Sequence, residues 1–374
     1  MKNILITGGA GFIGTNLTYR LVDLGYNITI LDNLSKQIHN QDSPLIKKIK
    51  EVSNFIEGDV RKKSDWSKAI KGQDAIIHLA AETGTGQSMY DIARYNEVNI
   101  MGTANLLDIL TNKKHNVNKI IIASSRSIYG EGKYYCKNHG IIYPGMRDEK
   151  NMSDGRFDIF CEICNNIVEM RATDESSRIS PNSIYAITKQ QQEQITLLIG
   201  KVLKIPTVAL RFQNVYGPNQ SLSNPYTGIL SIFSTSILNG NNIEVYEDGK
   251  ETRDFIYIDD AVDAIILSLK KEEANYHIFN VGSGVATPVL DIANILKRLY
   301  DSNIEVKVNG KYRLGDIRNN FADLTRINKL LGFRPNVNLD KGISMFVSWV
   351  KSQKIQFDKY QSSIEELENK GLIR

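Results

Sequence analysis

Cysteine is scarce in this chain of 374 residues, which contains only three, and all of them lie between positions 136 and 164. So few thiols exclude a disulfide framework and indicate a reducing compartment with a local use for the cluster. No apolar run approaches the roughly 18 residues that a membrane span needs. The first residues lead directly into a predicted strand, without the pattern of a signal peptide, so we expect a cytoplasmic protein that does not bind membranes.

An excess of one charge sign is also lacking, because 46 Lys and Arg residues face 42 Asp and Glu residues, for a net charge of +4. No basic tract marks a nucleic-acid or membrane surface. The small positive balance instead suits an anionic small molecule. With 41% hydrophobic residues, the chain can build a large core with a smaller appended domain.

Short β-branched runs alternate with helical stretches in the first half of the chain, which is typical of βαβ units and a parallel sheet. We therefore predict an α/β fold with a doubly wound Rossmann parallel sheet and a smaller, mixed α/β substrate-binding subdomain. Strands are predicted at 2–7, 27–32, 53–57, 74–80, 118–125 and 205–211. Helices are predicted at 11–25, 90–116, 183–203, 228–239, 259–271, 287–301 and 340–352.

These elements divide the chain into two predicted units, with the Rossmann domain at 1–211 and the substrate-binding subdomain at 212–352. Residues 130–180 break the βα pattern with Gly, Pro, Asn and Asp, and we interpret them as an insertion. Residues 353–374 form either a terminal helix or a frayed tail. In the helix at 183–203, a buried stripe is expected from the apolar positions Ile187, Ile195, Leu198 and Ile199.

Three glycines, Gly8, Gly11 and Gly14, follow the first predicted strand at the spacing GxxGxxG. Gly8 permits a tight turn, Gly11 lets backbone amides approach a pyrophosphate, and Gly14 lets the helix lie close to the sheet. Asp32 ends the second strand, where a carboxylate accepts hydrogen bonds from the adenosine ribose and disfavours a 2′-phosphate. NAD is therefore the predicted cofactor, the alternative being a structural turn followed by a strand-end cap.

Other strand ends supply further predicted cofactor contacts. Asp59 would accept a hydrogen bond from the adenine amine and Val60 would pack on its ring, although Asp59 is also a common turn residue. Small residues after His78 would let the cofactor pass, whereas His78 itself is expected to be a core histidine. The remaining predicted contacts are Phe12, Ile13, Asn33, Leu79, Ala80 and Ala81.

Tyr185 and Lys189 lie four residues apart on a predicted helix, so both project from one face. An ammonium close to a phenol lowers its pKa and makes the tyrosine a usable general base. Such a pair is often an ordinary exposed one, but Ser125 ends the fifth predicted strand, where a doubly wound sheet meets its ligand. Ser125 would hydrogen-bond the reacting hydroxyl.

Together these residues resemble the extended short-chain dehydrogenase/reductase superfamily, in its sugar-nucleotide epimerase and dehydratase branch. The resemblance extends to about residue 350 and includes the runs at 210–218, 248–255 and 280–284. It implies that Tyr185 is the base, that Lys189 also holds the nicotinamide ribose, and that Ser125 completes the triad. It places Asn99 near the cofactor.

The same resemblance implies a nucleoside-diphosphate sugar as substrate and a homodimer formed through the helices at 90–116 and 183–203. Arg253 and Arg313 match family arginines near the phosphates, Asn214 matches a phosphate contact, and Asp316 would orient the nucleotide ribose. The full set of predicted substrate contacts is Thr83, Gln87, Ser88, Ser125, Arg126, Asn214, Arg253, Arg313 and Asp316.

Dehydratases of this branch carry an Asp-Glu pair after the catalytic Ser or Thr, whereas here Arg126 and Ser127 follow Ser125. Epimerisation at C4 of a (6-deoxy)hexose through a transient 4-keto sugar is therefore favoured. The alternatives are a 4-ketoreductase, a 4,6-dehydratase or a non-catalytic NAD-binding protein. The runs at 81–89 and 123–132 resemble the dTDP-L-rhamnose 4-epimerase type, which forms dTDP-6-deoxy-L-talose and carries a similar cysteine-bearing insertion.

The three cysteines and one histidine form two short motifs in the insertion, Cys136 with His139 and Cys161 with Cys164. Two such motifs at this spacing suit a tetrahedral Cys₃His zinc site. The metal would be structural, because four protein ligands leave no open position for water. Free thiols, or a degenerate site in which His139 does not bind, are the alternatives.

Overall fold

A computed structural model describes residues 1–39, 44–226 and 228–374, and its centre is a seven-stranded sheet in which every pairing is parallel. The strand order is β14-β9-β5-β4-β1-β2-β3, which confirms the doubly wound prediction. The strands are β1 (Asn3–Thr7), β2 (Asn27–Asp32), β3 (Asn54–Glu57), β4 (Ala75–His78), β5 (Lys119–Ser125), β9 (Thr207–Phe212) and β14 (Ile278–Val281).

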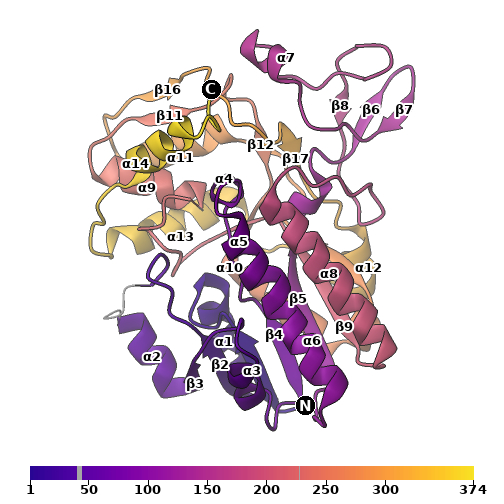
Figure 1. The fold of residues 1–374 in the computed structure, drawn as a ribbon. Helices are drawn as coiled ribbons and strands as arrows, with labels where there is room; N and C mark the ends of the chain where they lie inside the picture. The colour runs from indigo at the N-terminus through magenta and orange to yellow at the C-terminus, as the bar shows by residue number, and fades with distance from the viewer. Residues whose placement is uncertain (40–43, 227) are drawn as a thin grey trace.

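Helices cover both faces of this sheet, with α6 and α8 in front of it in Figure 1 and α1 and α10 behind. Alternate residues of β1 explain the two layers, because Ile4 and Ile6 join one core cluster and Leu5 joins the other. The helices of this part are α1 (Phe12–Asp23), α2 (Pro44–Val52), α3 (Lys63–Ala69), α6 (Gly102–Asn112), α8 (Ile184–Val202), α10 (Ile258–Lys270) and α12 (Thr325–Leu331).

The helix predicted at 90–116 is divided into three pieces. They are α5 (Ile92–Tyr95), a π-helical segment (Asn96–Met101) and α6. α4 (Thr85–Ser88) is a single turn ahead of them. The helices outside the main layers are α9 (Ile229–Leu238), α11 (Val289–Tyr300), α13 (Leu339–Lys351) and α14 (Tyr360–Asn369). α14 packs through Ile364 and Leu367, so the last segment contains a helix.

β14 joins the main sheet beside β9, and α10 packs against α1. Both elements come from the segment at 212–352, whose assignment to a separate subdomain remains a prediction. The same segment also forms small sheets of two or three strands outside the main one. Their strands are β10 (Asn214–Tyr216), β11 (Ile243–Val245), β12 (Thr252–Arg253), β13 (Phe255–Tyr257), β15 (Thr287–Pro288), β16 (Val306–Val308) and β17 (Asn319–Asn320).

The insertion at 130–180 forms a three-stranded sheet in the order β7-β6-β8 and a short helix, at the upper right of Figure 1. Its elements are β6 (Tyr134–Cys136), β7 (Gly140–Ile142), α7 (Glu149–Ser153) and β8 (Glu169–Met170). A small core of Tyr134, Ile159, Val168 and two of the cysteines holds it together.

The buried stripe predicted for α8 is wrong. Leu198 is 62% exposed and Ile187 is 38% exposed, while Ile195 and Ile199 are only partly buried. The face turned inward is small and polar, and consists of Ala186, Thr188, Lys189, Gln192, Glu193, Thr196 and Gly200. This helix packs on β5 through its small and polar residues, and so its larger apolar residues face outward.

Candidate active site

A cleft of about 1170 Å³ opens at the carboxyl ends of the parallel strands, and the glycine turn forms part of its wall. Gly8 has a φ of +67°, and a Cβ at Gly14 would lie 2.4 Å from the carbonyl oxygen of Gly8. Both positions therefore require glycine. The turn leaves the start of α1 close to the sheet, which is a cradle that fits a pyrophosphate.

Asp32 lies at the end of β2 on the wall of the same cleft. Its carboxylate accepts hydrogen bonds from the backbone N–H groups of Ala10 at 3.0 Å and Leu34 at 2.9 Å. His39 Nε2 lies 3.6 Å from Asp32 Oδ1. These contacts fix the carboxylate beside the glycine turn, where the sequence predicts the adenosine ribose.

Most predicted cofactor residues line the cleft together. They are Gly8, Gly11, Phe12, Ile13, Gly14, Asp32, Asn33, Val60, Leu79, Ala80, Ala81, Tyr185 and Lys189. Asp59 and Asn99 are not in its wall over the described residues. Asp59 forms an ion pair with Arg61 at 2.7 Å, and Asn99 binds the backbone N–H of Glu82 at 2.8 Å and the hydroxyl of Thr188. Asn99 therefore supports the wall from behind through Glu82, which lines the cleft.

Ser125, Tyr185 and Lys189 lie together in the cleft. Ser183 caps α8 by accepting a hydrogen bond from the N–H of Ala186 at 3.1 Å. This cap puts Tyr185 in the first turn of the helix and Lys189 one turn later on the same face. The hydroxyl of Ser125, at the end of β5, lies near the phenol of Tyr185, at the start of α8, and lowers the pKa of that phenol.

The pKa values of this group differ from the prediction that Lys189 lowers the pKa of Tyr185. Burial raises the pKa of the Tyr185 phenol, and Ser125 and Arg126 offset it in part. Burial also lowers the pKa of Lys189 to about 7, against the opposing effect of the Glu193 carboxylate. Desolvation thus disfavours the charged form of Lys189, which is the ammonium that the prediction relies on to stabilise the phenolate of Tyr185.

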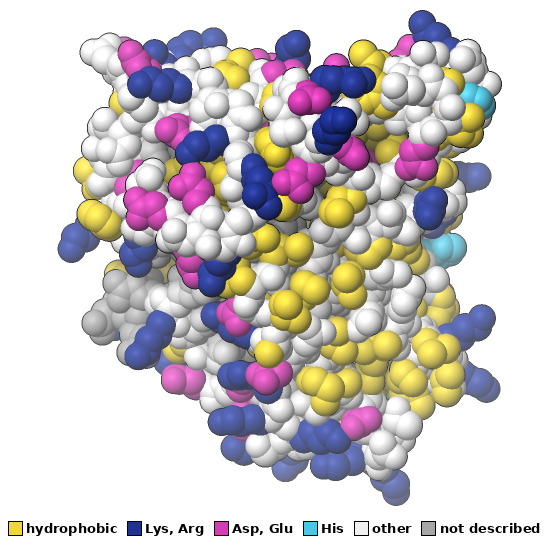
Figure 2. Space-filling model, turned by 45° about the horizontal axis from the view of Figure 1, so that its top comes forward, with side chains coloured by type: hydrophobic (Ala, Val, Ile, Leu, Met, Phe, Trp, Pro, Cys, Tyr) yellow, Lys and Arg dark blue, Asp and Glu magenta, His cyan; other side chains and the backbone are white. Residues whose placement is uncertain are grey.

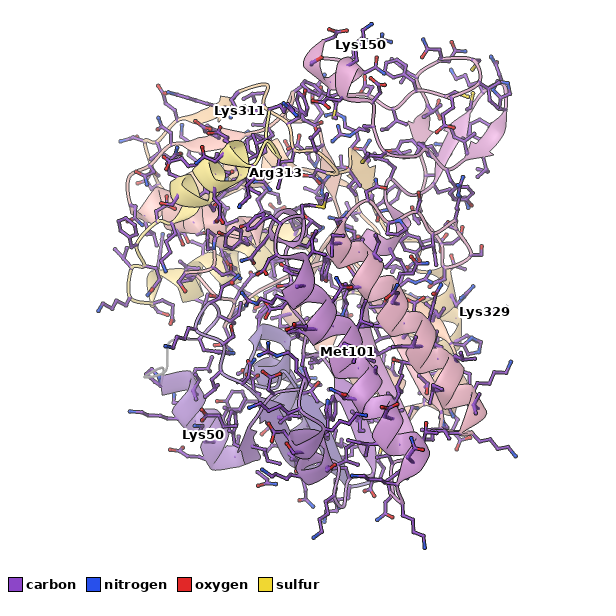
Figure 3. The ribbon with its side chains drawn as sticks, in the orientation of Figure 1. Lys50, Met101, Lys150, Lys311, Arg313 and Lys329 are labelled. Atoms are coloured by element: carbon purple, nitrogen blue, oxygen red, sulfur yellow. The ribbon has the colours of Figure 1, made fainter. Side chains whose placement is uncertain are left out.

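Charged groups from distant segments line the other end of the cleft. Arg253 Nη2 forms an ion pair with Asp316 Oδ1 at 2.9 Å. The guanidinium of Arg313 lies over the ring of Tyr246 at 4.8 Å, beside α14 in Figure 3. Although burial alone would raise the pKa of Asp316, Arg253 and Arg313 hold it at about 2. Asp316 is therefore ionised and anchors Arg253 at this end.

Arg126 lines the cleft between Tyr185 and these arginines, and within the described residues no hydrogen bond or ion pair holds its guanidinium. Burial and the nearby Arg253 lower its pKa to about 10. An unpaired guanidinium in a cleft favours an anionic ligand. Thr83 and Asn214 also line this part.

Gln87 and Ser88 do not line the cleft in the described part of the chain. Gln87 bonds to Gln37 at 2.9 Å and Ser88 bonds to the carbonyl of Thr85 at 2.6 Å. Both are buried in α4, so they shape the wall without facing the cavity.

Two acidic residues were not predicted. Glu193 accepts hydrogen bonds from Ser124 at 2.6 Å and from Arg211 at 2.5 Å, behind Lys189. Glu251 lines the cleft and is 7% exposed; burial raises its pKa to about 7. Glu251 lies inside the sequence run at 248–255 that carries the family resemblance, and Glu193 lies one turn after Lys189. The spacing of four residues between Lys189 and Glu193 on one helix was the sequence signal that could have identified Glu193.

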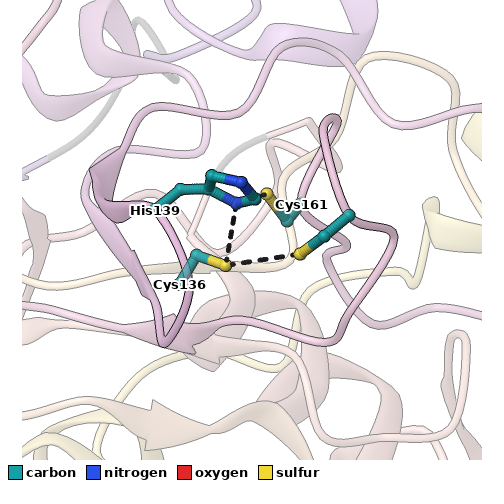
Figure 4. A group of neighbouring side chains, drawn as sticks. Cys136, His139 and Cys161 are labelled. Atoms are coloured by element: carbon teal, nitrogen blue, oxygen red, sulfur yellow. Dashed lines mark hydrogen bonds between the residues drawn. The ribbon is translucent and has the colours of Figure 1, made fainter.

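The four residues of the predicted metal motifs come together in the insertion (Figure 4). Cys136 Sγ lies 3.6 Å from His139 Nδ1 and 3.6 Å from Cys164 Sγ, and Cys161 Sγ lies 3.4 Å from His139 Nδ1. Tetrahedral zinc with bonds of about 2.0–2.3 Å separates its ligands by roughly 3.3–3.8 Å. The three thiols are free of disulfides, so this donor set fits zinc.

Known proteins are similar to this chain over more than nine tenths of its length. The dTDP-L-rhamnose 4-epimerase of Burkholderia thailandensis is 37% identical over 94% of this chain and 96% of its own length. A UDP-glucuronic acid 4-epimerase structure from Bacillus cereus, in complex with UDP-glucuronic acid and NAD, has a TM-score of 0.76 at 25% identity and covers 93% of this chain and 99% of its own. A UDP-N-acetylglucosamine 4-epimerase from Methanobrevibacter ruminantium has a TM-score of 0.74 at 28% identity, with coverage of 94% and 99%.

The family model of NAD-dependent epimerases and dehydratases matches residues 4–142 and 165–282. The matched segments contain the glycine turn, Ser125, Tyr185 and Lys189. The unmatched residues between them, 143–164, belong to the cysteine insertion. The chain is a member of the NAD-dependent epimerase/dehydratase family.

Proposed function

We propose that this protein is an NAD-dependent sugar-nucleotide 4-epimerase that acts on a nucleoside-diphosphate (6-deoxy)hexose. The observation that carries the proposal is the shared cleft, in which Ser125, Tyr185 and Lys189 lie between the glycine turn and the arginines that suit a diphosphate. The names of the similar proteins support 4-epimerisation in particular. A cytoplasmic location remains a prediction from the sequence.

The cleft fits NAD because glycine is required at the turn and Asp32 lies fixed beside it. In our proposal Gly11 and Gly14 let the pyrophosphate approach the start of α1, Asp32 holds the adenosine ribose, and Lys189 holds the nicotinamide ribose. When bound, NAD accepts a hydride from C4 of the sugar and later returns it.

The protein's own groups then move the proton. Tyr185 takes the proton of the C4 hydroxyl, and Ser125 hydrogen-bonds the same oxygen. Tyr185 gives the proton back when the 4-keto sugar is reduced on its other face. Arg126 contacts the sugar-phosphate end, and Arg253 and Arg313 bind the diphosphate, so the nucleotide stays bound while the sugar turns over.

The test is to incubate the purified protein with UDP-, dTDP- and GDP-hexoses without added cofactor and to follow the products by NMR. We expect a stereoisomer of one substrate at C4. Consumption of NADH or NADPH in proportion to product would identify a ketoreductase instead, and loss of water would identify a dehydratase. A panel with no product would favour a non-catalytic NAD-binding protein.

We also propose a structural zinc ion bound by Cys136, His139, Cys161 and Cys164. The spacing of the four donor atoms supports it, as does the small core of the insertion, which has only a handful of buried apolar residues. Bound metal would supply the stability that this core lacks.

A homodimer through α5, α6 and α8 is the third proposal. Figure 2 shows hydrophobic side chains gathered on the face that these helices form. Exposed apolar residues on it are Ile92 (48%), Met101 (54%, labelled in Figure 3), Leu198 (62%) and Val202 (65%). A contiguous apolar surface of this kind favours association with a second copy.

A further inference from the structure

The insertion turns back onto the loop that carries Arg313 and Asp316. Met152 and Phe157 of the insertion form a small buried cluster with Tyr312, and Leu314 packs against it. Tyr312 and Leu314 are the two neighbours of Arg313 in the sequence. Residues from the insertion thus fix the backbone on both sides of an arginine of the cleft.

A buried arginine makes a second contact between the insertion and this loop. Arg147 Nη2 donates hydrogen bonds to the carbonyl oxygen of Asp316 at 3.1 Å and to Glu247 Oε1 at 2.6 Å. Its side chain is 5% exposed, and Arg147 Nε lies 3.4 Å from Glu131 Oε1. Removing one partner would leave the other charge buried and uncompensated, which strongly favours keeping this contact.

Asp316 connects these contacts of the insertion to the cleft. Asp316 Oδ1 is bound by Arg253 Nη2 at 2.9 Å, and both residues line the cleft, whereas Arg147 does not. The positive charge of Arg147 also contributes to the low pKa of Asp316. Arg147 therefore holds the backbone of Asp316 and favours the ionised form of its carboxylate. Asp316 in turn lines the cleft.

A second link holds Arg318, two residues after Asp316. Glu131 accepts hydrogen bonds from the backbone N–H of Arg318 at 2.9 Å. The Arg318 guanidinium binds Glu247 at 2.9 Å and Asp158 of the insertion at 3.3 Å. The segment from Asp316 to Arg318 is thus held from the insertion side at both ends.

From these contacts we infer that Arg147 is a positioning residue for the bound sugar nucleotide, and that the cysteine insertion is part of the substrate-binding apparatus. Arg147 holds Asp316, Asp316 holds Arg253, and Arg253 faces the diphosphate. This inference rests on the proposed function, because it assumes that Arg253 and Asp316 bind the nucleotide sugar. Residues 143–164 lie outside the family match, so this support is an addition to the common fold.

The test is Arg147→Gln, with Arg171→Gln as the matched control. Arg171 also belongs to the insertion, but its side chain is 45% exposed, and it contacts the exposed Glu169, the carbonyl oxygen of Met170 and the ring of Tyr135. Binding of dTDP, UDP and GDP to the NAD-containing protein is measured by calorimetry, and kcat and KM are measured with the active sugar nucleotide. NAD content and Tm are recorded for each variant.

We expect Arg147→Gln to raise the Kd of the preferred nucleotide and the KM about tenfold or more, with kcat changed less than about threefold. Arg171→Gln should match the wild type. Unchanged Kd in a folded Arg147→Gln protein would overturn the inference, as would a loss confined to kcat.

Phe157→Leu serves as a second variant if Arg147→Gln does not fold, because it loosens the packing beside Arg313 without removing a charge. It should raise the Kd in the same direction, and an unchanged Kd would overturn the inference. A wild-type protein that binds none of the three nucleotides would contradict the proposed function itself, which separates the two failures.

Discussion

The ring of Tyr95 meets the ring of Tyr185 nearly at a right angle, with 6.5 Å between the ring centroids. Tyr95 is fully buried, and its hydroxyl donates a hydrogen bond to the carbonyl oxygen of Gly84 at 3.0 Å. The aromatic contact holds the ring of Tyr185 independently of its hydroxyl. The hydroxyl can therefore be removed without displacing the ring.

Tyr185→Phe should lower turnover by about 10²–10⁴-fold, because the general base is lost while the ring contact stays. NAD content should equal that of the wild type. Turnover is followed by NMR, and NAD is measured after denaturing the protein. Turnover close to that of the wild type would show that another group is the base.

The purified protein should contain about one zinc ion per chain, measured by elemental mass spectrometry. Cys161→Ser should lose the metal and lower the Tm, because the insertion has a small core of its own. Lys137→Ala is the control, because Lys137 lies between the proposed ligands Cys136 and His139 without a ligand role, and this variant should keep the zinc. His139→Gln tests the alternative in which His139 does not bind the metal. Full zinc retention in this variant would show that the protein ligands are the three cysteines alone.

Leu198→Asp should convert a dimer into a monomer, because it places a charge in the apolar face of α8. Light scattering coupled to gel filtration should give twice 42.1 kDa for the wild type and 42.1 kDa for the variant. Val285→Asp is the control, since Val285 is 59% exposed and lies in the loop between β14 and β15, outside these helices. A wild-type protein that is monomeric at micromolar concentration would contradict the proposed interface.

His78 should make the fold sensitive to acid. Burial and the nearby Lys189 lower its pKa to about 3, from an ordinary value of 6.5. Between pH 6.5 and 3 the unfolded chain binds a proton that the folded chain does not, so stability rises with pH and is lost as the pH falls. The contribution is about 1.4 kcal/mol per pH unit in this window.

His78→Gln should flatten that slope, because glutamine has no imidazole to protonate and still offers polar atoms to the hydroxyls of Thr7 and Thr103. Urea unfolding between pH 7 and 4 gives the free energies of unfolding. His277→Gln, at an exposed histidine, is the control and should keep the wild-type slope. Equal slopes in the wild type and His78→Gln would refute the assignment.

Local patterns predicted much of this fold and its site. The glycine turn, Asp32 and the Tyr185–Lys189 spacing depend on contacts within one strand, turn or helix, so they are visible in the sequence. The family membership that they indicated is confirmed. The roles of the individual site residues stay predictions.

Contacts between distant segments explain what was missed. Arg147 and Asp316 are 169 positions apart, and no local pattern joins them. The inner face of α8 was misassigned because helical periodicity assumes an apolar core, whereas Lys189 and Glu193 lie on the buried side. β14 was not predicted as a strand of the main sheet, since its pairing with β9 appears only in three dimensions.

The pairing of β14 with β9 limits where chimaeras of such enzymes can be joined. Because the chain leaves the sheet after β9 and returns to it in β14, a fragment ending at Phe212 would expose the unpaired backbone groups of β9 along a sheet edge. The segments that bear Asn214 and Arg253 lie between these two strands. Chimaeras that exchange the segments bearing Asn214 and Arg253 therefore need two junctions, one on each side of these segments, with β9 and β14 taken from the same parent.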